Sequence, residues 1–146
     1  MAPGDKNVSD SDEQILQLDE DLRQQGVKYC LAAFVDAHGI PKSKSVPIDH
    51  FQRMMRGSEL YTGAALDGLG QGPDDDELAL FPDPNAVTIL PWRPEVAWAP
   101  GNLKYHEEPW PMCSRTILAT QLERAAEMGY RVNLGIECEV YLVTRE

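Results

Sequence analysis

The sequence is poor in basic residues, has no long apolar run and shows no secretory start. It holds 13 lysines and arginines against 24 aspartates and glutamates, a net charge of −11. Nucleic acid is therefore excluded as a partner, because phosphate binding needs a basic surface. No stretch approaches the roughly 18 apolar residues of a membrane span, which excludes a membrane protein. Residues 1–11 have neither the basic start nor the apolar centre of a secretory signal.

Cysteine is also scarce. Cys30, Cys113 and Cys138 are odd in number and widely spaced, a pattern typical of reduced thiols in a cytoplasm. No histidine motif accompanies Cys113 or Cys138, so we expect these two to be small apolar fillers rather than nucleophiles. The expected compartment is the cytoplasm.

Two segments lack the features of common ligand loops. The glycine-rich stretch 59–73 has no Gly-Lys-Ser/Thr ending and is not a phosphate loop. The acidic run 74–77 has neither the alternating ligands nor the fixed turn glycine of a calcium loop. We expect the first segment to be a mobile or specially shaped loop and the second to be solvated.

Apolar periodicity predicts three helices after a frayed polar tail over residues 1–11. The first helix spans residues 12–25. Asp49 and Ser114 are candidate N-caps of helices over residues 50–56 and 114–128. The last of these is expected to bury an apolar stripe that consists of Ile117, Leu118, Leu122, Ala125 and Ala126.

Strand signals predict a small, mostly antiparallel or mixed sheet. The predicted strands are 27–35, 40–46, 78–81 and 86–90, with a further hairpin over residues 96–105. Pro41 and Pro47 restrict the second strand to an edge or to ends without ladder hydrogen bonds. A new unit is expected to start near Pro111.

The last stretch, residues 135–142, alternates apolar and polar side chains. If it is a strand, Glu137 and Glu139 share one face, roughly 6.6 Å apart along the backbone. Two carboxylates at that spacing can converge on a hard cation. The same pattern also fits a strand with one solvated face, and the alternation alone does not decide between them.

Five ordered segments resemble the glutamine synthetase family across residues 27–143. They are residues 36–39 between two strands, 59–63, 76–83, 86–92 and 135–141. Each segment is a weak signal alone, and their order and spacing carry the resemblance. The chain is similar to the branch that includes γ-glutamylmethylamide synthetases and divergent glutamine synthetase-like enzymes.

The resemblance implies an α+β fold, with a β-grasp-like N-terminal domain followed by the start of a catalytic domain. By this match residues 1–26 are an N-terminal tail and helix, 27–110 the β-grasp domain, and 111–146 the incomplete beginning of the catalytic domain. Family members have several hundred residues. We therefore expect the N-terminal portion of an enzyme, inactive when taken alone.

The resemblance also implies an activity. In the family, ATP phosphorylates the side-chain carboxylate of L-glutamate, and an amine displaces the phosphate from the γ-glutamyl phosphate. It further implies a homo-oligomeric ring, expected to be a dodecamer, with Glu137 and Glu139 as ligands of Mg²⁺ or Mn²⁺. Such ions neutralise phosphate oxygens during transfer.

A loop of the family's N-terminal domain reaches into the neighbouring subunit's active site, where an aspartate helps to bind and deprotonate ammonium. Thr62 stands at the place of that aspartate, and a hydroxyl is not an anionic base at neutral pH. Asp67 or Glu77 could compensate, so Thr62, Asp67 and Glu77 are the candidate catalytic residues. The acceptor stays open between ammonium and a small alkylamine such as methylamine.

One alternative is a non-catalytic β-grasp interaction or regulatory module of the same ancestry. A reading frame that continues with further ligand motifs would favour the enzyme, and a stop codon after Glu146 would favour the module. His106, beside Glu107 and Glu108, is expected to lie in an exposed loop.

Overall fold

A computed structural model describes residues 6–145, with side chains from residue 11 onward. Its elements are α1 (Lys6–Gln24), β1 (Tyr29–Val35), β2 (Pro41–Pro47), the 3₁₀ turn η1 (Ile48–His50), α2 (Phe51–Met55), β3 (Glu59–Tyr61), the 3₁₀ turn η2 (Gly63–Ala65), β4 (Leu78–Pro82), β5 (Thr88–Leu90), β6 (Arg93–Tyr105), β7 (Glu108–Pro109) and α3 (Ser114–Glu127). The predicted tail over residues 1–11 was wrong from Lys6 onward, where α1 already begins. Residues 1–5 lie outside the described residues.

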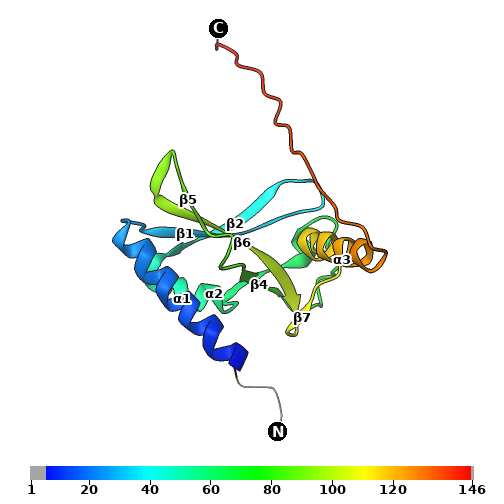
Figure 1. The fold of residues 1–146 in the computed structure, drawn as a ribbon, viewed down its shortest axis with the longest axis horizontal. Coiled ribbons are helices and arrows are strands. Elements are labelled where there is room, and N and C mark those ends of the chain that lie inside the picture. The colour runs from blue at the N-terminus through cyan, green and yellow to red at the C-terminus, as the bar shows by residue number, and fades with distance from the viewer. Residues whose placement is uncertain (1–5, 146) are drawn as a thin grey trace.

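The described strands form one mixed sheet in the order β2-β1-β6-β4-β3, and β5 and β7 also pair with β6. β1 and β6 run parallel at its centre, whereas the other pairs are antiparallel. Helices α1 and α2 cover one face of this sheet (Figure 1). The α+β, β-grasp-like class is therefore confirmed, and β2 lies at an edge, as its two prolines predicted.

The core lies between the sheet and these two helices. Alternate residues of β1 (Cys30, Ala32 and Phe34) face the helices and are buried, because successive side chains of a strand point to opposite faces. They pack in one cluster with Leu22 of α1 and Phe51 of α2. On the opposite side, α3 approaches β6 through Arg115, which donates to Asn102 Oδ1 at 2.9 Å.

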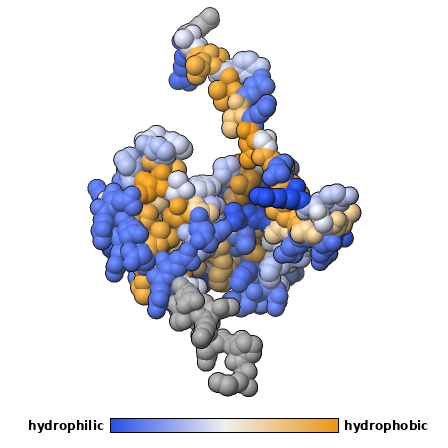
Figure 2. All heavy atoms as spheres, in the orientation of Figure 1, coloured by the Kyte–Doolittle hydropathy of each residue, from blue (hydrophilic) through white to orange (hydrophobic). Residues whose placement is uncertain are grey.

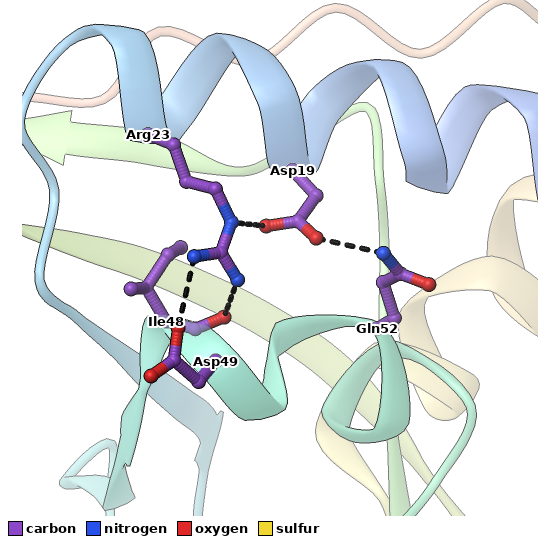
Figure 3. A network of polar contacts seen from close by, with 5 residues as sticks. All are labelled: Asp19, Arg23, Ile48, Asp49 and Gln52. Carbon is purple, nitrogen blue, oxygen red and sulfur yellow. Dashed lines mark hydrogen bonds and ion pairs between the residues drawn. The ribbon is translucent and has the colours of Figure 1, made fainter.

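A polar network ties α1 to the segment after β2 (Figure 3). The buried carboxylate of Asp19 accepts hydrogen bonds from Arg23 Nε and from Gln52 Nε2, both at 2.8 Å. The guanidinium of Arg23 also donates to Asp49 Oδ1 and to the backbone oxygen of Ile48, both at 2.9 Å. The prediction that Asp49 caps the following helix was wrong, because no side-chain cap bond is made there and Asp49 pairs with Arg23.

The turn between β1 and β2 is organised by a second buried carboxylate. Asp36 accepts hydrogen bonds from the backbone N–H groups of His38 and Ile40, both at 2.9 Å, and lies 3.3 Å from Lys42 Nζ. The Ile40 N–H, aided by His38 and Lys42, lowers the pKa of Asp36, although desolvation opposes the shift. Such local side-chain bonds are why aspartate favours turns.

The predicted hairpin over residues 96–105 was wrong. β6 is instead a single strand of 13 residues that runs through Pro100 and Gly101. The ring nitrogen of Pro100 has no hydrogen to donate to the ladder, but its carbonyl oxygen accepts from Asp83 N at 2.8 Å. Gly101 pairs with Pro82, where β4 approaches so closely that a Cβ would lie 2.6 Å from the carbonyl carbon of Phe81.

Helix α3 is attached mainly at its beginning. Ser114 Oγ donates to the backbone oxygen of Val35 at 2.8 Å instead of capping the helix, and the N-cap position is Cys113. Arg115 donates to Asn102 Oδ1 and to Asp83 Oδ2. The predicted apolar stripe is not buried: Ile117, Leu118 and Leu122 are exposed, because no described element packs over them.

Candidate functional site

The loop that follows β3 begins at a side-chain pair. The β3–β4 ladder ends where Tyr61 pairs with Leu78, so Thr62 and Glu77 are the next positions in the same antiparallel register. Thr62 Oγ1 donates a hydrogen bond to Glu77 Oε1 at 2.8 Å. Both side chains are exposed to solvent. The structure thus brings together two of the three residues that the sequence singled out.

Tyr61, the residue before Thr62, anchors the end of β3 in the core. The ring of Tyr61 contacts Phe34 edge-to-face with centroids 5.0 Å apart, and burial raises the pKa of the Tyr61 phenol to about 12. Lys44 Nζ lies over the Tyr61 ring at 5.2 Å from its centroid. Thr62 and Glu77 therefore extend from a buried and rigid strand end.

The glycine-rich loop is shaped rather than loose. Leu69, in its middle, is buried in the core cluster, and its backbone oxygen accepts a hydrogen bond from Trp110 Nε1 at 3.0 Å. Gly68 and Gly70 have φ angles of +80° and +72°, a region that favours glycine. This explains why the segment carries glycines without being a phosphate loop.

Asp67, the third candidate, lies apart from the pair. Its side chain is 92% exposed and its nearest recorded partner is His38 Nε2, at 3.7 Å. His38 belongs to the β1–β2 turn, whereas Glu77 precedes β4. Among the described contacts none joins Asp67 to Thr62 or Glu77.

Sequence reasoning named His106 but did not place it beside the acidic run. His106 Nε2 lies 3.3 Å from Asp76 Oδ2, and the His106 ring contacts Tyr105 with centroids 4.1 Å apart. His106 and Glu107 have φ angles of +48° and +68° and form the tight turn between β6 and β7. The expected exposed loop is confirmed, but no sequence signal placed it against Asp76.

The second candidate site is the segment that carries Glu137 and Glu139. Residues 130–145 form neither helix nor strand and run away from the body of the molecule (Figure 1). The predicted strand over residues 135–142 is therefore wrong for this structure, because a strand needs a neighbour for its backbone groups and none lies beside it. Figure 2 shows apolar and polar side chains alternating along the projecting segment.

The chemistry of this segment fits a hard divalent ion only in part. Glu137 and Glu139 offer the oxygen ligands that Mg²⁺ and Mn²⁺ prefer, and Tyr141 Oη donates to Glu139 Oε1 at 2.8 Å, so alternate side chains meet on one side. However, no group of three or more potential ligands occurs within the described residues. Two carboxylates could contribute to a metal site but do not complete one.

An apolar groove lies on the sheet face opposite the helices. Its volume is about 700 Å³, and it is lined by Leu31, Val35, Pro41, Thr88, Leu90, Pro91, Trp92 and Trp98. Trp92 is 79% exposed there. Exposed apolar patches of this kind mark surfaces that bind another protein or a ligand.

Comparison with known sequences identifies relatives with a common chemistry. The chain is 32% identical over 125 residues to a glutamate–methylamine ligase of Methyloversatilis universalis, an alignment that covers 85% of this chain and 28% of the relative. It is 31% identical over 129 residues to a glutamine synthetase of Rhizobium meliloti, covering 88% of the chain and 29% of that protein. The chain thus spans less than a third of the length of the curated relatives it matches. No family model matches it.

Comparison with solved structures identifies the same kinds of protein as the sequence comparison. A complex of GmaS with ADP superimposes with a TM-score of 0.71 and 30% identity, covering 76% of this chain and 26% of that one. GmaS without ligand matches equally well. A glutamine synthase homolog with 23% identity and a TM-score of 0.59 shares the fold.

The relatives that the chain matches are named as a glutamate–methylamine ligase and a glutamine synthetase, so the class that the comparisons define is a family of carbon–nitrogen ligases. The chain is a homologue of the glutamine synthetase family, and the resemblance predicted from its sequence is confirmed. Among residues 6–145, no helix is long and apolar enough to cross a membrane.

Proposed function

We propose that this chain is the N-terminal part of an ATP-dependent glutamate–amine ligase. The observation that carries the proposal is the 32% identity to a glutamate–methylamine ligase over 85% of the chain. The substrates of such an enzyme are L-glutamate, ATP and an amine. Ammonium and methylamine are both candidate acceptors, because the chain matches a methylamine ligase and a glutamine synthetase at 32% and 31% identity.

Glu77 is the residue we assign to the amine. The reaction needs a neutral amine, since the nitrogen lone pair forms the new bond to the γ-carbonyl carbon as the phosphate leaves. An alkylammonium ion must first give one proton to a base, and Glu77 is the carboxylate that Thr62 Oγ1 orients, at 2.8 Å. Thr62 then serves as a neutral hydrogen-bond donor, and Asp67 has no part in the pair.

Glu137 and Glu139 are proposed to contribute to the Mg²⁺ or Mn²⁺ sites of the whole enzyme. When bound, such an ion neutralises the charge on the transferred phosphoryl group. The chain's own contribution is to present two carboxylates on alternate residues of one segment. The domain boundary at residue 111 belongs to this proposal.

A ring-shaped homo-oligomer, a dodecamer by the family resemblance, is proposed as the working form. The groove around Trp92 and Trp98 supports an interface on the open face of the sheet. Three free cysteines support a reducing compartment, the cytoplasm.

The test is amine-dependent ATP hydrolysis by the protein from its native source, with its intact mass measured on the same material. We expect a mass several times 16.3 kDa and activity that depends on glutamate and an amine. Glu77→Gln is expected to lower kcat/KM for the amine about 100-fold, whereas Asp74→Asn, an exposed carboxylate of the same loop, is the matched control. A mass of 16.3 kDa without activity would favour the non-catalytic module.

A further inference from the structure

Gln71 is a partly buried amide in the glycine-rich loop with an unusual hydrogen-bond balance. Its Nε2 donates to the backbone oxygen of Asp76 at 3.0 Å. Its Oε1 is buried and accepts no hydrogen bond from the described residues. A buried acceptor without a donor costs free energy, so its position calls for a reason.

The reason lies in Gly63. A Cβ at Gly63 would overlap Gln71 Oε1 and would lie 2.8 Å from Gln71 Cδ. The glycine hydrogen that a Cβ would replace therefore points at this oxygen, the arrangement of a weak C–H···O contact. The φ angle of Gly63 is not positive, so its backbone does not demand glycine, and the missing side chain makes room for Gln71.

The two residues that Gln71 contacts, Gly63 and Asp76, lie next to the Thr62–Glu77 pair on its loop side. Gly63 follows Thr62 and Asp76 precedes Glu77, so in the register that pairs Tyr61 with Leu78 these residues are the next rung beyond the pair. The backbone ladder has ended there. The Gln71 side chain therefore joins the two segments where the ladder has ended, because it donates to the Asp76 oxygen on one segment and lies against Gly63 on the other.

We infer that Gln71 is the positioning residue of the amine site: its amide, clamped between Gly63 and Asp76, holds Thr62 and Glu77 in hydrogen-bonding register. The clamp follows from the geometry alone. Its consequence for the amine substrate rests on the proposed function.

The first test uses this chain. Gln71→Ala removes the clamp, and Gly63→Ala displaces the Gln71 carbonyl. We expect both to convert the Thr62 side chain from one χ1 rotamer to an average of at least two, measured by three-bond NMR couplings. Gly72→Ala is the matched control, because a Cβ there meets only Asp75 Oδ2 at 3.8 Å. A single Thr62 rotamer in both variants would overturn the proposal.

A double-mutant cycle separates the clamp from general loop stability. Gly63→Ala is expected to lower Tm by about 2–4 °C in the parent chain and by less than about 1 °C in the Gln71→Ala background. The difference arises because the added methyl group then has an empty space to enter. Equal decreases in Tm in the two backgrounds would contradict the inference that the absence of a side chain at Gly63 makes room for Gln71.

The second test uses the proposed ligase. Gln71→Ala is expected to raise KM for the amine about three- to tenfold, with KM for ATP and glutamate changed by less than about twofold. A purely structural role would shift all three constants together, which would overturn the positioning role. Loss of the Thr62 rotamer with an unchanged amine KM would instead reject the amine site and leave the clamp standing.

Discussion

The phenol of Tyr61 donates a hydrogen bond to the backbone oxygen of Ala32 at 2.7 Å. Tyr61 lies in β3 and Ala32 in β1, two strands that are separated in the sheet by β6 and β4. The bond therefore crosses the curved inner face of the sheet. It fixes the strand end from which Thr62 and Glu77 project.

Removing this hydrogen bond is expected to weaken the whole domain. Tyr61→Phe keeps the contact with Phe34 but loses the donor, and we expect a loss of about 1 kcal/mol in the free energy of unfolding, measured by urea titration. Tyr29→Phe is the matched control, because Tyr29 is 46% exposed and makes no recorded hydrogen bond through its hydroxyl. Equal losses in the two variants would show that the Ala32 contact contributes nothing.

The same tyrosine predicts an alkaline limit of stability. Burial raises its pKa from 10.0 to about 12, so the folded state keeps a proton that the unfolded chain releases. Its contribution is complete below pH 10 and is lost between pH 10 and about 12. Cys30, whose pKa burial raises from 9.0 to about 12, adds a similar loss that begins near pH 9. Unfolding free energy measured against pH is expected to fall less steeply above pH 10 in Tyr61→Phe than in the parent chain.

Gly101 is expected to be intolerant of any side chain. A Cβ there would lie 2.6 Å from the carbonyl carbon of Phe81 and 2.7 Å from Pro82 Cα, and these backbone atoms cannot move without opening the β4–β6 ladder. Gly101→Ala is therefore expected to cost about 3 kcal/mol in unfolding free energy. Gly135→Ala, where a Cβ meets nothing within 4 Å, is the control. A stable Gly101→Ala variant would contradict the close approach.

Thiol labelling is expected to separate the three cysteines. Cys30 and Cys113 are buried, whereas Cys138 is exposed, and burial raises the pKa of Cys30 to about 12. One thiol per chain is expected to react rapidly with Ellman's reagent at pH 8, and Cys138→Ser is expected to abolish that phase. Three rapidly reacting thiols would mean that the core opens readily.

The groove around Trp92 predicts an interface between subunits. Trp92→Ser removes the most exposed aromatic side chain of the groove, and burying a side chain of this size contributes about 2–3 kcal/mol. We expect the assembly of the proposed ligase to dissociate at concentrations at least tenfold higher, measured by light scattering. Leu16→Ser, on α1 at the opposite face of the sheet, is the control. An unchanged assembly would place the interface elsewhere.

Local rules predicted much of the fold. The turn at residues 36–39, the edge position of the strand that carries Pro41 and Pro47, and the strand over residues 78–81 all follow from turn residues, proline and alternation. The hairpin over residues 96–105 was wrong, because Pro100 and Gly101 are typical of a turn. Here they lie in a continuous strand whose neighbour approaches too closely for any residue but glycine.

The candidate site, too, was predicted only in part from the sequence. The loop could be located from the sequence by its order among the family's segments, and Thr62, Asp67 and Glu77 could be named. Which acid accompanies Thr62 could not be named, because the β3–β4 register decides it: the ladder that ends at Tyr61 and Leu78 places Glu77 opposite Thr62 and leaves Asp67 near His38.

The sequence by itself determined the family, the α+β class and the alternation of Glu137 and Glu139, because these depend on the order and period of residues along the chain. Only the tertiary structure decided the pairing of Thr62 with Glu77, the seat of Gln71 on Gly63 and the buried end of Tyr61. These depend on which distant segments become neighbours, and strand register, which fixes such neighbours, is set by the packing of the whole sheet.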